Sequence, residues 1–237
     1  MARRSRPRLQ RVVAQLLEQH GRQAPPPADT AFGLVLWEKV AYLAPDERRA
    51  EAFEMLRKRV GLTPQAILAA KLSVLREIAA AGGKVEIEKR AQNMQAAAAI
   101  VIDEFDGSLD NVLRLPNRDA MRALQRIYGI GEPGAERILL LMRAQRVLPL
   151  DSNAARTLMR LGYGADHKTY STMYKSVSDA AAKELRDDFD WLIDAHLLLR
   201  RHGKEICKTS APRCEMCSVR AECAYAIAHR GRSSMER

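Results

Sequence analysis

The sequence predicts an all-α protein of about ten short helices, and three observations carry this prediction. Apolar residues recur at three- and four-residue spacing along most of the 237-residue chain, which is the spacing of one helix face. No run alternates apolar and polar residues between turn signals, as a half-buried strand would. Clusters of Gly, Pro, Asn, Asp and Ser separate the helical stretches.

Turn signals of this kind separate several of the expected helices. The helical pattern covers six main stretches, at residues 11–20, 32–43, 47–60, 64–81, 86–105 and 179–201. The turn signals stand at residues 24–27, 82–83, 106–108, 116–117 and 129–134. Two more helices are expected within residues 118–145, one on each side of the last of these turns.

Composition excludes some function classes. Hydrophobic residues make up 47% of the chain, which excludes a disordered protein, and no run approaches the roughly 18 apolar residues that span a bilayer. The 39 Lys and Arg residues outnumber the 29 Asp and Glu residues, giving a net charge of +10. This surplus favours a polyanionic partner, with nucleic acid ahead of a membrane surface.

Changes in composition predict the domain boundaries. Residues 1–11 hold five Arg and no acidic residue, and a proline-rich break follows at residues 24–30. A second change comes near Leu148 and Pro149, after which Arg and His are frequent. We expect a basic N-terminal segment (1–31) that packs with a C-terminal domain (148–237), and a helical domain (32–147) between them.

All four cysteines lie in one short loop, with the spacing Cys207-x6-Cys214-x2-Cys217-x5-Cys223. A secreted disulfide scaffold would spread its cysteines along a short chain, so this pattern predicts a reducing compartment and a metal centre. In a bacterium that compartment is the cytoplasm, where the protein would associate with the nucleoid. Zinc and a [4Fe–4S] cluster both accept four thiolates, and the physics of the ligands leaves both open.

A glycine-rich turn joins the two helices expected within residues 118–145. Gly129, Gly131 and Gly134 allow the backbone to turn tightly and to approach a ligand closely. The free amides at the start of the second helix favour an anion such as a DNA phosphate. An ordinary tight turn is the alternative for this motif taken alone.

In combination, these motifs resemble the endonuclease III family of DNA glycosylases. The cysteine spacing is the pattern of that family's iron–sulfur loop, and the run LRRHGKEIC that ends at Cys207 is similar to its approach to the first ligand. The run Leu124-x-x-Ile-Tyr-Gly-Ile-Gly131 resembles the family's helix-hairpin-helix. Asp151 follows at the family's spacing, and the resemblance covers roughly residues 30–228.

The resemblance implies a fold, a cofactor and a partner. The fold would be a six-helix domain with a helix-hairpin-helix and a helical iron–sulfur domain, with a DNA-binding cleft between them. A [4Fe–4S] cluster, favoured over zinc, would be held by the four cysteines. The protein would be a monomer that acts in base excision repair on duplex DNA with a damaged or mispaired base. Expected DNA contacts are Gly129, Ile130, Gly131, Gly134 and Asn153.

The same resemblance assigns the catalytic carboxylates. Asp151 would stabilise the positive charge that develops on the sugar when the N-glycosidic bond breaks. It would also serve as the N-cap of a helix over residues 152–161, and both roles can hold together. The run Leu36-Trp-Glu38-Lys-Val40 resembles the mismatch adenine glycosylases, in which a glutamate protonates the leaving base. An exposed helix residue is the alternative for Glu38.

Departures from the family pattern shape the expected activity. Bifunctional members carry a lysine two residues after the second hairpin glycine, where this chain has Pro133. We therefore expect a monofunctional glycosylase with weak or no lyase activity. The alternatives are a bifunctional enzyme that uses a relocated amine, from Lys39 or Lys84, and a relative that binds lesions without catalysis.

The segment after Glu38 lacks the glutamines of the adenine glycosylases. Tyr42 and Leu43 stand there, either as an apolar wedge that fills the gap of a flipped base or as core residues of their helix. The sequence does not select the lesion.

Overall fold

The computed structural model describes residues 8–165 and 167–229, and this part of the chain is all-α, without any strand. The predicted fold class is confirmed. The arginine-rich residues 1–7 of the predicted basic segment lie outside the described residues.

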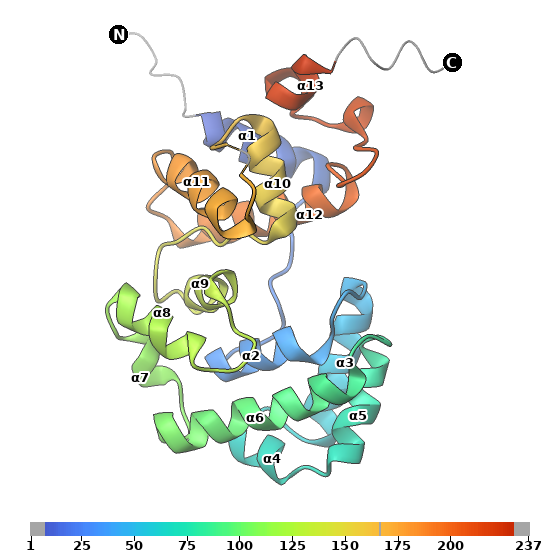
Figure 1. Cartoon of the computed structure of the whole chain (residues 1–237), viewed down its shortest axis with the longest axis vertical. Helices are drawn as coiled ribbons and strands as arrows, with labels where there is room; N and C mark the ends of the chain where they lie inside the picture. The colour runs from blue at the N-terminus through green and yellow to red at the C-terminus, as the bar shows by residue number, and fades with distance from the viewer. Residues whose placement is uncertain (1–7, 166, 230–237) are drawn as a thin grey trace. The chain divides into compact units, whose positions relative to one another are not determined.

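The described part of the chain divides into two compact units (Figure 1). One comprises the described residues of Met1–Pro25 and Arg146–Arg237, and the other comprises Pro26–Gln145. The first helix of the chain therefore belongs to the same unit as the last third. The sequence prediction sets the corresponding boundaries at 31/32 and 147/148.

The unit formed by residues 26–145 contains eight described helices. These are α2 (Ala31–Val40), α3 (Asp46–Arg59), α4 (Pro64–Ala69), α5 (Leu72–Ala81), α6 (Ile87–Phe105), α7 (Asp110–Leu113), α8 (Asn117–Gln125) and α9 (Glu132–Leu141). The long α6 packs against α2, α4 and α5 (Figure 1). The core of this unit includes the fully buried residues Phe53, Leu56, Ile78 and Met94.

The other unit is built from both ends of the chain. Its helices are α1 (Arg8–His20), α10 (Ser152–Leu161), α11 (Tyr170–Ala182), α12 (Phe189–Glu205), the short 3-10 turns η1 (Cys214–Met216) and η2 (Arg220–Glu222), and α13 (Ala224–Ala228). Helix α12 packs against α1 and α10. The contact with α10 is close, because a Cβ at Gly203 would lie 2.4 Å from the carbonyl oxygen of Asn153. No described helix is long and apolar enough to cross a membrane.

Two helices predicted as continuous are broken. The stretch 64–81 forms α4 and α5, and Ala70 between them is extended. The side-chain amide of Gln95 donates to the backbone carbonyl of Ala70 at 2.9 Å. This hydrogen bond satisfies a carbonyl that the end of α4 leaves without a helical partner. The stretch 179–201 is interrupted between α11 and α12, where Asp188 caps α12 through bonds from the amides of Asp190 and Trp191. The contact of Gln95 is long-range and the Asp188 cap is local, and apolar spacing alone reveals neither break.

Candidate functional site

The hairpin between α8 and α9 supplies an exposed, tightly turned backbone. Gly129 has φ +78°, in the left-handed region where glycine carries no steric penalty. Gly131 is the N-cap of α9, whose first-turn amides lack partners within the helix. The side chain of Ile130 is buried, and its amide donates to the carbonyl of Ile127 at 3.0 Å. The glycines, rather than Ile130, therefore present the surface that an anion can approach.

Pro133 stands in the first turn of α9, a position that suits proline because no intrahelical bond is lost there. The position at which the resemblance to endonuclease III would place a lyase lysine thus keeps its helix but has no side-chain amine. Glu132, beside it in the same turn, carries a negative charge.

Lys39 places an amine directly beneath the hairpin. Its side chain is buried, and Nζ donates to the carbonyl oxygen of Tyr128. A Cβ at Gly129 would lie 3.3 Å from this Nζ, so the amine and the turn are in close contact. Burial lowers the pKa of Lys39 to about 8, and the neighbouring Glu38 opposes part of that shift. Of the two amines named from the sequence, the structure brings Lys39 to the hairpin, and Lys84 is exposed.

Glu38 forms an ion pair that joins α2 to α9. Its Oε2 lies 2.6 Å from Nη2 of Arg137, and the two side chains are 23% and 17% exposed. Glu38 is therefore not a solvated surface residue. Arg137 holds one oxygen of this carboxylate, so any contact of that oxygen with a bound partner requires the ion pair to open.

Tyr42 and Leu43 follow the end of α2 and are 50% and 79% exposed. The alternative that they are core residues is wrong, because α2 ends at Val40 instead of continuing to residue 43. Leu43 has φ +49°, a conformation seldom adopted by a non-glycine residue. An exposed leucine held in this way is placed to contact a partner.

Arg90 is a site residue that the sequence reasoning missed. Its guanidinium, 4% exposed, donates to the carbonyls of Val40 (2.7 Å), Val85 (2.9 Å) and Gly83. It therefore ties the loop that carries Tyr42 and Leu43 to the turn before α6. The one signal in the sequence is an arginine on the apolar face of residues 86–105.

Asp151 is the N-cap of α10, which confirms the capping role expected from the sequence. Oδ1 accepts hydrogen bonds from the amides of Asn153 (2.9 Å) and Ala154 (2.8 Å), and Oδ2 lies 3.3 Å from Nε of Arg200. The carboxylate is 20% exposed. It is thus fixed in direction and still reachable. The side chain of Asn153 accepts from Arg156 at 2.9 Å.

The four cysteines are free and line one hollow of about 290 Å³, a volume that includes space open to solvent. Two arginines of α10 hold the loop in place. Arg156 donates to the carbonyl of Cys207 (2.9 Å), and Arg160 donates to that of Lys208 (2.6 Å). The hollow is also lined by Arg160, Ile206, Pro212, Arg213, Arg220, Tyr225 and Ala226.

The number of cysteines allows either a zinc ion or an iron–sulfur cluster. Four sulfurs around a zinc ion, each about 2.3 Å from it, would lie roughly 3.8 Å apart. In the described residues, no group of three or more His, Cys, Asp or Glu side chains is gathered closely enough for one metal ion. The four thiols line one hollow, and this donor set fits a group that takes four thiolate ligands.

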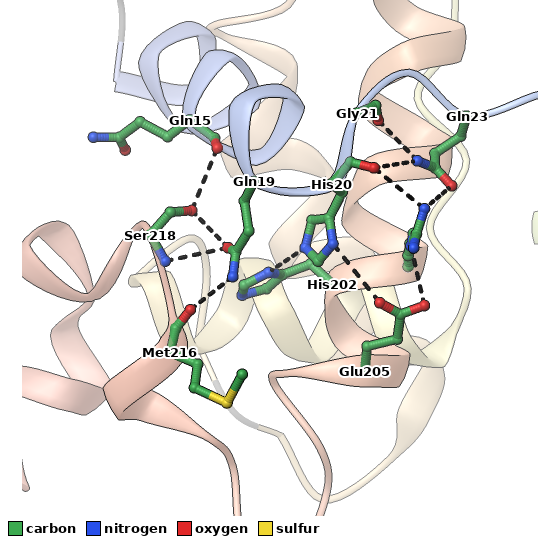
Figure 2. A network of polar contacts seen from close by, with 10 residues as sticks. Gln15, Gln19, His20, Gly21, Gln23, His202, Glu205, Met216 and Ser218 are labelled. Atoms are coloured by element: carbon green, nitrogen blue, oxygen red, sulfur yellow. Dashed lines mark hydrogen bonds and ion pairs between the residues drawn. The ribbon is translucent and has the colours of Figure 1, made fainter.

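Helix α1 braces this loop from one side (Figure 2). The side-chain Nε2 of Gln19 donates to the backbone carbonyl of Met216 at 2.6 Å. Oε1 of the same side chain accepts from the hydroxyl of Ser218 at 2.7 Å. Met216 and Ser218 flank Cys217, so one side chain of α1 fixes the backbone on both sides of that cysteine. No sequence pattern indicates this contact, because Gln19 and Ser218 are 199 residues apart.

Comparisons with known proteins support the motif analysis. A scan of protein-family models finds no match. Endonuclease III of Sulfolobus acidocaldarius is 27% identical over 195 residues, which span 82% of each chain. Endonuclease III homolog 1, chloroplastic, of Arabidopsis thaliana is 28% identical over 85% of this chain, which spans about half (51%) of that protein.

Solved structures show the same fold. A trapped covalent intermediate of endonuclease III with DNA superposes with a TM-score of 0.74 at 17% identity, covering 94% of this chain and 97% of that one. A thermostable thymine-DNA glycosylase gives a TM-score of 0.73 at 16% identity, covering 93% and 97%. The chain therefore has the fold of endonuclease III and of a thymine-DNA glycosylase, and its sequence is similar to that of endonuclease III proteins.

Proposed function

We propose that the chain is a monofunctional DNA repair N-glycosylase that excises a damaged or mispaired base from duplex DNA. The observation that carries this proposal is the carboxylate of Asp151. Two backbone amides fix one of its oxygens, the other faces Arg200, and the group stays partly exposed. A negative charge held in this way stabilises the cation that forms at C1′ as the base departs.

The reaction is a hydrolysis with a simple balance. The bond between C1′ and the base nitrogen breaks, a water oxygen bonds to C1′, and the base leaves with a proton. Asp151 supplies the charge that favours the sugar cation. Glu38 is the second carboxylate, and its role as proton donor requires the Arg137 ion pair to open when DNA binds.

DNA binding is assigned to the exposed hairpin and the loop after α2. Gly129, Gly131 and Gly134 offer backbone close to the start of α9, where the helix dipole favours a phosphate. Leu43 and Tyr42 are large, exposed and apolar, as a wedge that replaces a flipped base must be. A duplex with one altered base is the partner, bound by a monomer.

Cys207, Cys214, Cys217 and Cys223 would hold a [4Fe–4S] cluster. When bound, the cluster would crosslink the loop and keep it rigid. Arg213 and Arg220, which line the same hollow, would then be presented on a fixed surface suited to phosphate contact.

Duplexes that each contain one modified or mispaired base test the proposed activity. We expect one or more of them to break at the altered position after hot alkali, and to stay intact without alkali, because hydrolysis leaves an abasic site. Strand breakage without alkali contradicts monofunctional action. Tight binding to a lesion with no alkali-sensitive site supports the non-catalytic alternative.

Borohydride reduction during the reaction is expected to trap no covalent adduct between protein and DNA. Pro133 has no amine, and the amine of Lys39 is buried and bonded to the hairpin carbonyl. A bifunctional endonuclease III serves as the positive control. An adduct that is lost in Lys39→Met and kept in Lys84→Met would contradict this expectation and would establish Lys39 as a relocated nucleophile.

A further inference from the structure

His202 lies enclosed between α1 and the cysteine loop, with only 1% of its surface exposed. Each ring nitrogen faces one partner. Nε2 is 3.4 Å from Sγ of Cys217. Nδ1 is 3.0 Å from Nε2 of His20, and Figure 2 shows the contact between these two rings. The imidazole therefore bridges helix α1 and one sulfur of the candidate cluster site.

The surroundings hold this ring at the sulfur. Nδ1 of His20 lies 3.8 Å from the carboxylate of Glu205, and the two imidazoles meet edge to face (Figure 2). The backbone carbonyl of His202 accepts from the amide of Cys207 at 2.8 Å, so the residue contacts two of the four cysteines. Gln19 holds the backbone on each side of Cys217, as described above.

The direction of the hydrogen bonds follows from the chemistry of a ligating cysteine. A metal-bound cysteine is a thiolate, and a thiolate only accepts hydrogen bonds. Nε2 of His202 must then carry the proton that points at Cys217. In a neutral imidazole Nδ1 is then an acceptor, and it accepts from Nε2 of His20.

We infer that His202 donates a hydrogen bond to the Cys217 sulfur and thereby raises the reduction potential of the cluster, with His20 as the residue that positions its ring. This inference rests on the proposed cluster. Reduction adds negative charge, and a hydrogen bond to a ligand sulfur stabilises the more negative state. Cys207 has a comparable partner in Nη1 of Arg160 at 3.5 Å, a longer contact.

Voltammetry of the cluster-loaded protein tests the inference without an activity assay. In His202→Phe the reduction potential of the cluster is expected to become more negative, because one charged hydrogen bond is lost. The shift corresponds to about a tenfold decrease in the equilibrium constant for one-electron reduction. His202→Gln keeps an N–H group near the position of Nε2 and is expected to stay close to the parent. An unchanged potential in His202→Phe overturns the inference.

His196 provides a matched control on the same helix. It is equally buried (1% exposed), and its Nδ1 pairs with the carbonyl of Pro149 at 2.9 Å instead of a sulfur. His196→Phe is expected to leave the potential unchanged. An equal shift in both phenylalanine variants would mean that general repacking, and not the hydrogen bond, sets the potential.

A measurement on the parent protein decides the matter even if His202→Phe does not load a cluster. With ¹⁵N-labelled histidine and the cluster in a paramagnetic state, electron–nuclear double resonance is expected to show coupling to one histidine nitrogen and to one exchangeable proton. A loaded cluster without this coupling overturns the inference alone. Purified protein without iron refutes the proposed cluster and the inference together.

Discussion

Asp151→Asn is expected to lower the single-turnover rate of base excision by about 10²–10³-fold, the usual cost of losing one group that stabilises transition-state charge. Asparagine caps helices as well as aspartate does, so the bonds from the amides of Asn153 and Ala154 are retained. The substitution removes the negative charge and the ion pair with Arg200. DNA affinity and melting temperature should stay near those of the parent.

Asp188→Asn is the control for this variant. Asp188 caps α12 in the same way, through bonds from the amides of Asp190 and Trp191, and lies in the same compact unit. Its substitution is expected to leave excision unchanged. Full activity in Asp151→Asn would remove Asp151 from the mechanism, and equal losses in both variants would assign the effect to helix capping.

Cys217→Ser is expected to remove most of the bound iron and sulfide and to lower the melting temperature by about 10 °C or more. For a protein of this length, a loss of 1 kcal/mol in the free energy of unfolding lowers the melting temperature by about 2–4 °C. Loss of the cluster is expected to cost several kcal/mol. The loop has little regular structure of its own, since only the short turns η1 and η2 lie between Ile206 and Ala224. Its other supports are hydrogen bonds from α1 and α10 and the contacts of His202 of α12 with Cys207 and Cys217.

Ser218→Ala is the matched control, because it changes the next residue and removes one hydroxyl bond to Gln19. This variant is expected to keep its iron and to melt within a few degrees of the parent. A Cys217→Ser protein with full iron content would contradict the assigned ligand. Parent protein with its sulfurs paired in disulfides would contradict the cluster itself.

The fold class followed from local patterns, because a helix needs only short-range spacing and a stop signal. Asp151 as an N-cap was readable for the same reason: its partners are two and three residues away. The break at Ala70 was not readable, because it depends on the contact of Gln95, which lies 25 residues away. The start of α12 has a local cap at Asp188, but apolar spacing alone does not reveal it.

The site shows the same division. The spacing of the cysteines and of the hairpin glycines identifies them in the sequence. The hydrogen bonds of Arg90 with Val40 and of Lys39 with Tyr128 join residues 50 and 89 positions apart, which no spacing pattern indicates. For Leu43 the sequence left both the exposed wedge and the core residue open, because apolar spacing continues past the end of α2 at Val40. A hydrogen bond between a polar side chain and a backbone group far away in the sequence cannot be predicted from residue spacing.

Mass-spectrometric detection of the free base is the most direct test of the central claim, that this chain hydrolyses an N-glycosidic bond. The parent protein, mixed with duplexes that each contain one altered base, is expected to release that base in amounts equal to the abasic sites formed. Asp151→Asn is expected to release almost none in the same time. No free base from any duplex, with lesion binding intact, would show that the chain recognises DNA without cutting the glycosidic bond.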